Sequence, residues 1–486
     1  MKYLLTLLTI FIICNSSAQI NSDVFYKEYD QYHEKTIKNR RFKHSDIQPL
    51  LSSLEKENGF SLKKLGESIE GRSISMVSVG TGKTTVLLWS QMHGDESTAT
   101  MALFDIFNYL KSNKELLSKL NLHFIPMLNP DGAEKFTRRN ALGVDINRDA
   151  LRLQSPESRI LKNTRDSLNA VFGFNLHDQS KYYNAERTEK AATISFLAPA
   201  YNYEKTINDV RGNAMKVIVE MNKVLQKYAP GQVGRYDDSF EPRAFGDNIQ
   251  KWGTSAILIE SGGYQNDPEK QFIRKLNYVS ILSALQSIAN GSYQKADLKE
   301  YGKIPENDRK LFDLKVEKVN FNLLGENYTV DLGFMHNERA NKEETEFYYS
   351  GTIVEVGDLS TYYGYQTIDA ENLEFKLGET YPKILNSASE LDNLNFEELL
   401  KKGYTNVAMS EIPSSDKFTF YPVNIVDVNK VAILKNSKQP ESQLKIGKNP
   451  SFVLMKNNVV KYAIVNGFVF DLEKGVNGIK NGVVNP

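Results

Sequence analysis

Hydrophobic residues follow two different patterns along the chain. In the first half, short apolar runs such as Val86–Met92, Val171–Leu176 and Ser255–Ile259 alternate with longer segments whose apolar residues recur at helical spacing. Short continuous apolar runs are typical of strands that are buried on both faces, and their alternation with helices indicates an α/β fold. We therefore expect a sheet with helices on both of its faces in this part of the chain.

The expected helices carry recognisable start signals. The segment Ser97–Leu110 places its apolar residues on one face. Another helix is expected to begin at Pro156, because Ser155 offers a capping hydroxyl and proline suits the first helical position. Further helices are expected over Tyr203–Tyr228 and from Asn266 to about Ala289.

One glycine-rich segment resembles a phosphate-binding loop. It reads Gly80-Thr81-Gly82-Lys83-Thr84-Thr85. The phosphate-loop pattern requires a further glycine where Val77 stands, and it requires a helix where Val86–Trp89 indicates a strand. A hairpin turn is the better interpretation of this segment.

After Gly291 the pattern changes. Residues 292–310 are polar and are expected to form a linker. Residues 311–486 contain short alternating stretches separated by turn signals, which indicate a β-rich second domain whose role the sequence does not reveal. One helical insert is expected there, at Glu390–Lys402.

The N-terminus has the layout of a secretory signal. Lys2 precedes the apolar run Tyr3–Ile13, and small polar residues follow it, so cleavage is expected after Ala18. Cys14 follows Ile13, whereas a lipid-attachment cysteine normally follows a small residue, and this argues against a lipoprotein. We therefore expect an exported protein whose first domain covers residues 19–291.

Composition excludes several classes of function. Lys+Arg and Asp+Glu number 60 each, and this balance gives no indication of a nucleic-acid partner. Cys14 is the only cysteine, so the mature chain would have no disulfide, no cysteine nucleophile and no sulfur-ligated metal. No transmembrane segment is expected after the signal.

Candidate chemical residues stand at the ends of the predicted strands. His93, His177 and Glu260 each close an apolar run, and Glu96 follows His93 by three positions. Ligand sites in open α/β sheets lie beyond the carboxyl ends of strands, so these side chains are expected to meet. Two histidines and one carboxylate suit a zinc ion with an open position for water, with His93, Glu96 and His177 as ligands. Glu260 would then be the general base that accepts the proton of the attacking water.

The segment between these strands supplies candidate substrate clamps. Asn147 and Arg148 can bind a carboxylate, since a guanidinium forms two parallel hydrogen bonds with it. Arg138 and its neighbour Arg139 can place a second guanidinium where negative charge develops on the carbonyl oxygen. Asp145 is spaced to support a ligand imidazole from behind.

These motifs resemble those of the zinc carboxypeptidase family, which has the carboxypeptidase A-like fold. The motifs that carry the resemblance occur in the family's order, across roughly residues 30–290: His93-Gly94-Asp95-Glu96, Asn129-Pro130-Asp131-Gly132, Gly143-Val144-Asp145-Ile146-Asn147-Arg148, Asn175-Leu176-His177 and Leu258-Ile259-Glu260. The resemblance implies a mixed, mostly parallel twisted sheet and one zinc ion per chain.

The resemblance also assigns roles to individual residues. It implies that Asn147 and Arg148 grip the terminal carboxylate of a peptide, and that Arg138, or else Arg139, stabilises the oxyanion. The family's mobile tyrosine has its nearest counterpart in Tyr236, although the register differs. The position that sets side-chain preference falls near Arg243, which would favour an acidic terminal residue if it faces the pocket.

The sequence thus predicts an exported zinc metallocarboxypeptidase that hydrolyses the C-terminal peptide bond of a peptide with a free carboxylate. Two alternatives use the same zinc residues: an amidase of peptidoglycan stem peptides and a deacylase of N-acyl amino acids. A non-enzymatic alternative is a zinc- or peptide-binding module that has lost catalysis. Glu260 argues against this last reading, because binding alone does not require a base.

Overall fold

The computed structural model describes residues 20–341, 344–412, 421–428, 444–476 and 482–485. The predicted signal sequence at residues 1–18, with Cys14, lies outside these residues, as does the apolar stretch at residues 432–434 that we assigned to the second domain. Among the described residues, no helix has both the length and the apolar character needed to cross a membrane.

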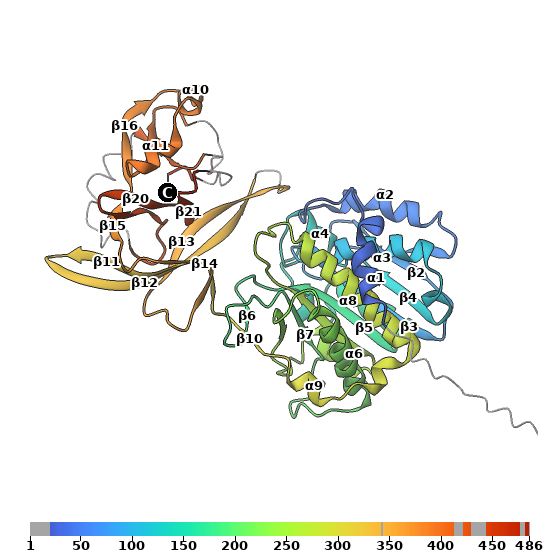
Figure 1. Ribbon diagram of the computed structural model, residues 1–486. Coiled ribbons are helices and arrows are strands. Elements are labelled where there is room, and N and C mark those ends of the chain that lie inside the picture. The colour runs from blue at the N-terminus through green and yellow to red at the C-terminus, as the bar shows by residue number, and fades with distance from the viewer. Residues whose placement is uncertain (1–19, 342–343, 413–420, 429–443, 477–481, 486) are drawn as a thin grey trace, which may run out of the picture.

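The first half of the chain forms one eight-stranded mixed sheet (Figure 1). Its spatial order is β1 (Phe60–Glu67), β2 (Ser73–Val79), β4 (Leu120–Ile125), β3 (Thr84–Ser90), β5 (Phe172–Asp178), β9 (Ser255–Ser261), β7 (Ile194–Leu197) and β8 (Val233–Arg235). The four central strands β4, β3, β5 and β9 run parallel. Antiparallel pairs occur between β1 and β2, β2 and β4, and β9 and β7. The predicted fold class is confirmed.

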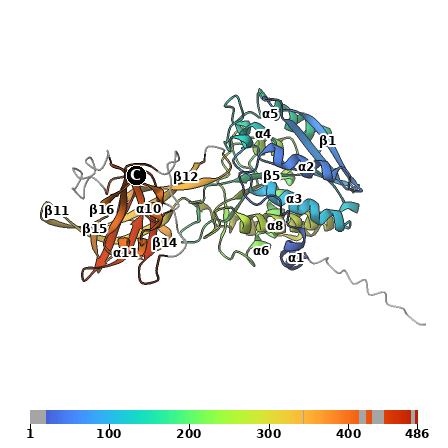
Figure 2. The same cartoon turned by 90° about the horizontal axis from the view of Figure 1, so that it is seen from above.

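Helices cover both faces of this sheet, as Figures 1 and 2 show. In β3, Val86 and Leu88 belong to one buried cluster whereas Leu87 and Trp89 belong to another, because successive strand side chains point to opposite faces. The helices are α1 (Ser22–Tyr32), α2 (His44–Leu54), α3 (Thr98–Ser112), α4 (Pro130–Glu134), α5 (Pro156–Leu168), α6 (Asp209–Leu225), α7 (Phe245–Lys251), α8 (Gln271–Asn290) and α9 (Lys299–Gly302). α1, α3, α6 and α8 contribute to the first cluster, and α5 and α7 contribute to the second.

The second part of the chain is rich in strands. An eight-stranded sheet contains β13 (Phe347–Gly357), β12 (Glu326–Ala340), β11 (Leu311–Leu323), β15 (Glu374–Leu377), β19 (Ser451–Lys456), β20 (Val459–Val465) and β21 (Phe468–Asp471) in this order, and β14 (Tyr363–Asp369) also pairs with β11. A three-stranded parallel sheet contains β16 (Glu379–Leu385), β17 (Tyr404–Met409) and β18 (Asn424–Asp427). The predicted β-rich character is confirmed.

The stretch expected to be a linker contains ordered elements. η3 (Ser292–Lys295) and α9 lie in it, and β10 (Asn307–Asp308) pairs with β6 (Asn184–Ala185) of the first part. The connection is therefore hydrogen-bonded to the loop that follows β5.

Two local predictions were wrong. The segment Gly80-Thr81-Gly82-Lys83 is not a hairpin turn, because β4 lies between β2 and β3 in the sheet. It passes over the start of β4, where the Gly82 amide donates to the Leu120 carbonyl at 3.2 Å. The helical insert at Glu390–Lys402 is split into α10 (Ala388–Asp392) and α11 (Phe396–Lys401), since Asn395 caps a new helix by accepting from the Glu398 amide.

Candidate metal centre and active site

The turn between β3 and α3 carries His93 and Glu96. The Glu96 amide donates to the His93 carbonyl at 3.2 Å, which closes the turn. A Cβ atom added to Gly94 would lie 2.0 Å from the carbonyl carbon of Gly132, so only glycine permits α4 to approach so closely. The buried Asn129 side chain caps α4 and contacts the Arg138 carbonyl at 3.3 Å. The two sequence motifs therefore form one packed unit.

His93, Glu96 and His177 meet at the carboxyl ends of β3 and β5. Their ligand atoms all lie within 4.8 Å of one another, and all three residues are buried. Nδ1 of His93 is 2.8 Å from Glu96 Oε1, Nδ1 of His177 is 2.6 Å from Glu96 Oε2, and the two Nδ1 atoms are 3.2 Å apart. Imidazole nitrogens and carboxylate oxygens that converge in this way are the donors that zinc accepts, so the residues fit the ion.

Partners outside this cluster orient its members. Asp145 Oδ1 lies 3.2 Å from His93 Nε2, the ring nitrogen that faces away from the cluster, and it also accepts from the Asn147 amide at 3.0 Å. The Asp178 amide donates to Glu96 Oε2 at 3.2 Å. Such hydrogen bonds fix the ring orientation of a metal-binding histidine and raise its basicity.

The electrostatics of the cluster favour a cation. Burial lowers the pKa of His93, but Glu96 and Asp145 outweigh it and raise that pKa to about 9. Burial, and then the charge of Glu96, raise the pKa of Glu260 well above its usual value. The carboxylates of Glu96 and Glu260 repel each other in this buried site. A divalent cation would offset that repulsion, because it stabilises the ionised form of both groups.

Glu260 and Tyr236 come from β9 and from the end of β8, which lie on either side of β7. In the parallel pair of β5 and β9, Glu260 is directly opposite His177, so both side chains point to the same face. Tyr236 follows β8, and its amide donates to the Phe196 carbonyl of β7 at 2.9 Å. Burial, and then the charge of Glu260, raise the pKa of Tyr236 above its usual value, so its hydroxyl stays protonated.

The two adjacent arginines have different surroundings. Arg138 donates through Nε to Asp145 at 3.0 Å and through Nη1 to Glu96 at 3.3 Å. Arg139 donates instead to the Gly143 carbonyl of its own turn at 3.0 Å. The structure thus brings Arg138, and not Arg139, to the cluster of His93, Glu96 and His177.

The predicted carboxylate clamp lies beside α7. Asn147 is in the 3-10 segment η2 (Ile146–Arg148), and its Oδ1 accepts from the Phe245 amide at 2.9 Å, which leaves its Nδ2 end as the donor for a ligand. Arg148 is partly exposed, with Nε 3.6 Å from Glu241. Arg243 forms a two-pronged pair with the same Glu241, at 3.1 and 2.9 Å, and its side chain is 59% exposed.

Two residues near the cluster were not predicted. Asp178 orients Glu96 through its backbone, and its carboxylate accepts from Lys270 at 2.9 Å. The hydroxyl of Tyr183 lies 3.4 Å from that of Tyr236. Adjacency to His177 was the only sequence signal for Asp178, and Tyr183 gave none, since its partner is distant in the sequence.

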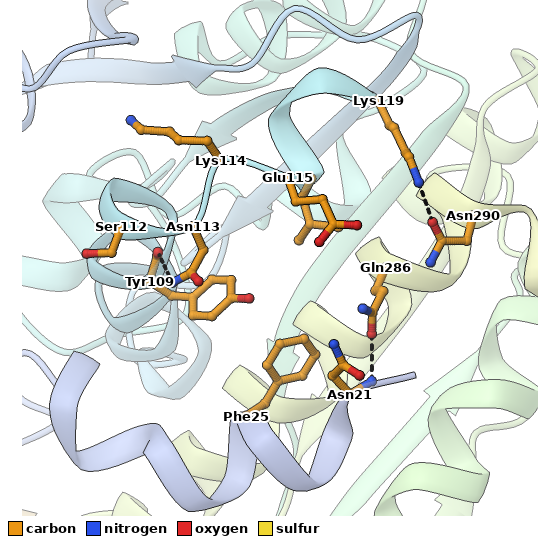
Figure 3. Close-up of a pocket in the computed structure, with 11 residues that line it drawn as sticks. Asn21, Phe25, Tyr109, Ser112, Asn113, Lys114, Glu115, Lys119, Gln286 and Asn290 are labelled. Atoms are coloured by element: carbon orange, nitrogen blue, oxygen red, sulfur yellow. Dashed lines mark hydrogen bonds between the residues drawn. The ribbon is translucent and has the colours of Figure 1, made fainter. Parts of the chain in front are cut away.

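A cavity of about 220 Å³ lies elsewhere (Figure 3). Residues from α1, the end of α3, η1 (Leu116–Ser118) and α8 line it, including Phe25, Tyr109 and Gln286. Because η1 immediately precedes β4, the cavity is at the amino-terminal edge of the parallel strands, opposite the metal-binding residues. None of the predicted site residues lines it.

Comparison with known proteins supports the resemblance. Residues 50–153 match the family model described as zinc carboxypeptidase. An uncharacterized protein of Zymomonas mobilis is 25% identical over 137 residues, which are 26% of this chain and 36% of that protein. Carboxypeptidase SOL1 of Arabidopsis thaliana is 26% identical over 178 residues, which are 29% and 36% of the two chains. The chain thus spans about a third of the length of these curated relatives.

Solved structures give more distant matches. A metallo-carboxypeptidase from Burkholderia cenocepacia has a TM-score of 0.42 and 17% identity, covering 51% of this chain and 69% of that one. Carboxypeptidase A from Helicoverpa armigera has a TM-score of 0.43 and 16% identity, covering 57% and 82%. The sequence match at residues 50–153 confirms that this chain resembles the zinc carboxypeptidase family, as its motifs predicted.

Proposed function

We propose that the chain is an exported zinc metallocarboxypeptidase, which removes the last residue of a peptide with a free C-terminal carboxylate. The observation that carries the proposal is the convergence of His93, Glu96 and His177 within 4.8 Å, with Glu260 opposite His177 on the next strand. Zinc, when bound, supplies a Lewis acid that polarises the scissile carbonyl and acidifies the attacking water.

The other steps of the proposed hydrolysis are carried out by side chains of this protein. Glu260 accepts a proton from the attacking water and delivers it to the leaving nitrogen as the C–N bond breaks. Arg138, anchored by Asp145, holds a guanidinium beside the cluster, where charge develops on the carbonyl oxygen. Tyr236 remains a neutral hydrogen-bond donor next to Glu260.

Asn147 and Arg148, the proposed carboxylate clamp, would determine which end of the peptide lies at the reaction centre. The Asn147 amide and the Arg148 guanidinium would bind the terminal carboxylate, since both side chains carry N–H donors and lie next to each other in η2. Arg243 is proposed to select an acidic terminal side chain, which requires that it leave Glu241 when the substrate binds. Measurement of cleavage of peptides ending in Glu, Lys or Phe tests this selectivity, and a preference for Lys would contradict it.

The domain division and the export are part of the proposal. We assign residues 1–18 to a cleaved signal, 19–291 to the catalytic domain, 292–310 to the connection and 311–486 to the second domain. Two sheets that share no strand support the division. Amino-terminal sequencing of the protein from its native cells tests the cleavage after Ala18.

The test combines metal analysis with a matched pair of substrates. The purified mature protein is expected to contain one zinc ion per chain. It should release the last residue of a peptide with a free carboxylate but leave the C-terminally amidated peptide intact, because the amide lacks the charge that Arg148 binds. Equal cleavage of both peptides would contradict the proposal that the enzyme acts at a free C-terminal carboxylate.

The base is tested by the variant Glu260→Gln. This change should lower kcat by a factor on the order of 10²–10⁴ without loss of zinc, because a glutamine cannot accept the proton. Glu204→Gln, at an exposed position, serves as the control. Unchanged turnover in the Glu260 variant would refute the mechanism. Turnover of peptidoglycan stem peptides or N-acyl amino acids without peptide cleavage would support the corresponding alternative.

A further inference from the structure

The connection and the second domain contact the loop that follows His177. The Leu311 amide donates to the Tyr182 carbonyl at 3.3 Å, and the Lys310 amide donates to Asn184 Oδ1 at 2.9 Å. The hydroxyl of Tyr365, on β14, donates to the Lys181 carbonyl at 2.5 Å. The backbone of this loop is therefore held by residues more than 120 positions away in the sequence.

Asp313 of β11 lies at the centre of this contact. Its carboxylate accepts from Lys181 Nζ at 2.7 Å, from the Tyr182 hydroxyl at 2.6 Å and from the His336 amide at 2.6 Å. The Asp313 side chain is only 11% exposed. A buried carboxylate that accepts three hydrogen bonds holds its donor groups firmly in place, because charge-assisted hydrogen bonds are stronger than neutral ones.

From this point a series of contacts leads to β7, the strand that pairs with the strand of the proposed base. Tyr183 is next in sequence to Tyr182, and its ring packs edge-on against Tyr236 with a centroid distance of 5.7 Å. Tyr236 lies beside Phe196 of β7, and the neighbouring Ser195 is paired with Glu260 on β9. Two tyrosines from separate segments therefore meet beside β7, which pairs with the strand of Glu260, and one of those segments is held by the second domain.

We propose that Asp313 is a positioning residue of the active site: it holds Lys181 and Tyr182 so that Tyr183 supports Tyr236 beside Glu260. This rests on the proposed function, which makes the region of Glu260 the reaction centre. The second domain is then a structural part of the active site and not only an appended module.

The decisive variant is Asp313→Asn. An asparagine keeps the shape but offers only one acceptor oxygen, and its NH₂ group faces donors, so the Lys181–Tyr183 segment should loosen. Asp331→Asn is the matched control, because Asp331 lies in the same sheet and its carboxylate accepts from the Lys318 and Leu359 amides of its own domain.

The first measurement does not depend on activity. Hydrogen exchange followed by mass spectrometry should show faster exchange in peptides covering residues 179–186 for Asp313→Asn but not for Asp331→Asn. Unchanged exchange in this segment would overturn the proposal. If the wild-type protein hydrolyses no peptide, the proposed function fails, yet the exchange result still decides whether Asp313 holds the loop.

The second measurement is a double-mutant cycle of Asp313→Asn with Tyr183→Phe. Asp313→Asn should lower kcat/KM by a factor of about 10–100, since small displacements of substrate-facing groups have effects of this size. In the Tyr183→Phe background the further loss should be clearly smaller, because Asp313 acts through Tyr183. Additive losses, or a loss equal to that of Asp331→Asn, would overturn the proposal.

A milder variant covers the case in which Asp313→Asn does not fold. Tyr182→Phe removes only the hydroxyl that donates to Asp313 and keeps the ring in place. It should raise exchange in residues 179–186 and lower kcat/KM in the same direction, by a smaller factor. No change in either quantity would count against the proposal.

Discussion

At the scale of single residues, Asp145 connects the cluster of His93, Glu96 and His177 to the proposed substrate-binding residues. The same Oδ1 atom contacts His93 Nε2 and accepts from the Asn147 amide, while Oδ2 accepts from Arg138. One carboxylate thus contacts the proposed metal ligand His93, the proposed oxyanion-stabilising Arg138 and the backbone of the proposed clamp residue Asn147. A substitution here should affect zinc binding before it affects folding.

This leads to a prediction for Asp145→Asn. The variant keeps an acceptor near His93 and Asn147 but loses the charge that supports the imidazole. Zinc affinity, measured by competition with a chelator, should fall by a factor of about 10–100. The exposed Asp209→Asn should bind zinc as the wild type does. An unchanged affinity in the Asp145 variant would show that this contact does not support the metal.

At the scale of elements, the register between neighbouring strands decides which of the proposed site residues lie side by side. His177 and Glu260 point to the same face of the sheet because β5 and β9 are parallel and pair these two residues directly. A shift of one residue would turn Glu260 to the opposite face of the sheet. The start of α7 contributes in a similar way, since the Phe245 amide orients Asn147 and the nearby Asp247 accepts from the Glu241 amide.

The raised pKa of Asp247 predicts how the stability of the folded protein depends on pH. Burial is the main cause that raises its pKa, from 3.8 to about 7. A raised pKa means that the protonated form stabilises the fold below about pH 4, and this contribution is lost as pH rises towards 7. Asp247→Asn removes the titration, so the variant should gain stability relative to the wild type over this range, with an upper limit of about 4 kcal/mol.

Urea unfolding at several pH values measures this difference. The control is the exposed Asp358→Asn, because a hydrogen bond from the Ser360 amide lowers the pKa of Asp358. A lowered pKa has the opposite sign, so that variant should lose stability relative to the wild type as pH rises. A stability difference between Asp247→Asn and wild type that does not vary with pH would contradict the prediction.

At the scale of the whole molecule, buried ion pairs join segments that are far apart in the sequence. Arg274 of α8 and Asp105 of α3 are both fully buried and form two hydrogen bonds, at 2.7 and 2.5 Å. Arg274 also donates to the Ile37 and Glu34 carbonyls, which fixes the segment between α1 and α2. Arg40, in this same segment, pairs with Glu338 of the second domain.

The central pair gives a prediction for Asp105→Asn. The change leaves the Arg274 guanidinium buried without its charged partner, which should lower the free energy of unfolding by about 3–5 kcal/mol. Urea unfolding measures the loss. The carboxylate of Asp166, which is largely exposed and pairs with Lys162 and Arg165, provides the control, and Asp166→Asn should cost about 0–1 kcal/mol. Equal losses in the two variants would show that burial does not govern the strength of the pair.

The sequence by itself determined the elements and the identity of the candidate residues. Apolar runs and capping signals are local properties, so the central strands, α5 and the strand-end positions of His177 and Glu260 followed from them. The motif around His93 and Glu96 indicated the metal because residue type and spacing already restrict the chemistry.

Only the tertiary structure decided the features that depend on contacts between distant segments. It placed β4 between β2 and β3, so the glycine-rich segment is a connection that crosses the start of β4 and not a hairpin turn. It separated Arg138 from Arg139, since adjacent side chains can point to different partners. It also brought Asp313 to the loop after His177, because nothing in local sequence specifies a hydrogen bond across 131 positions.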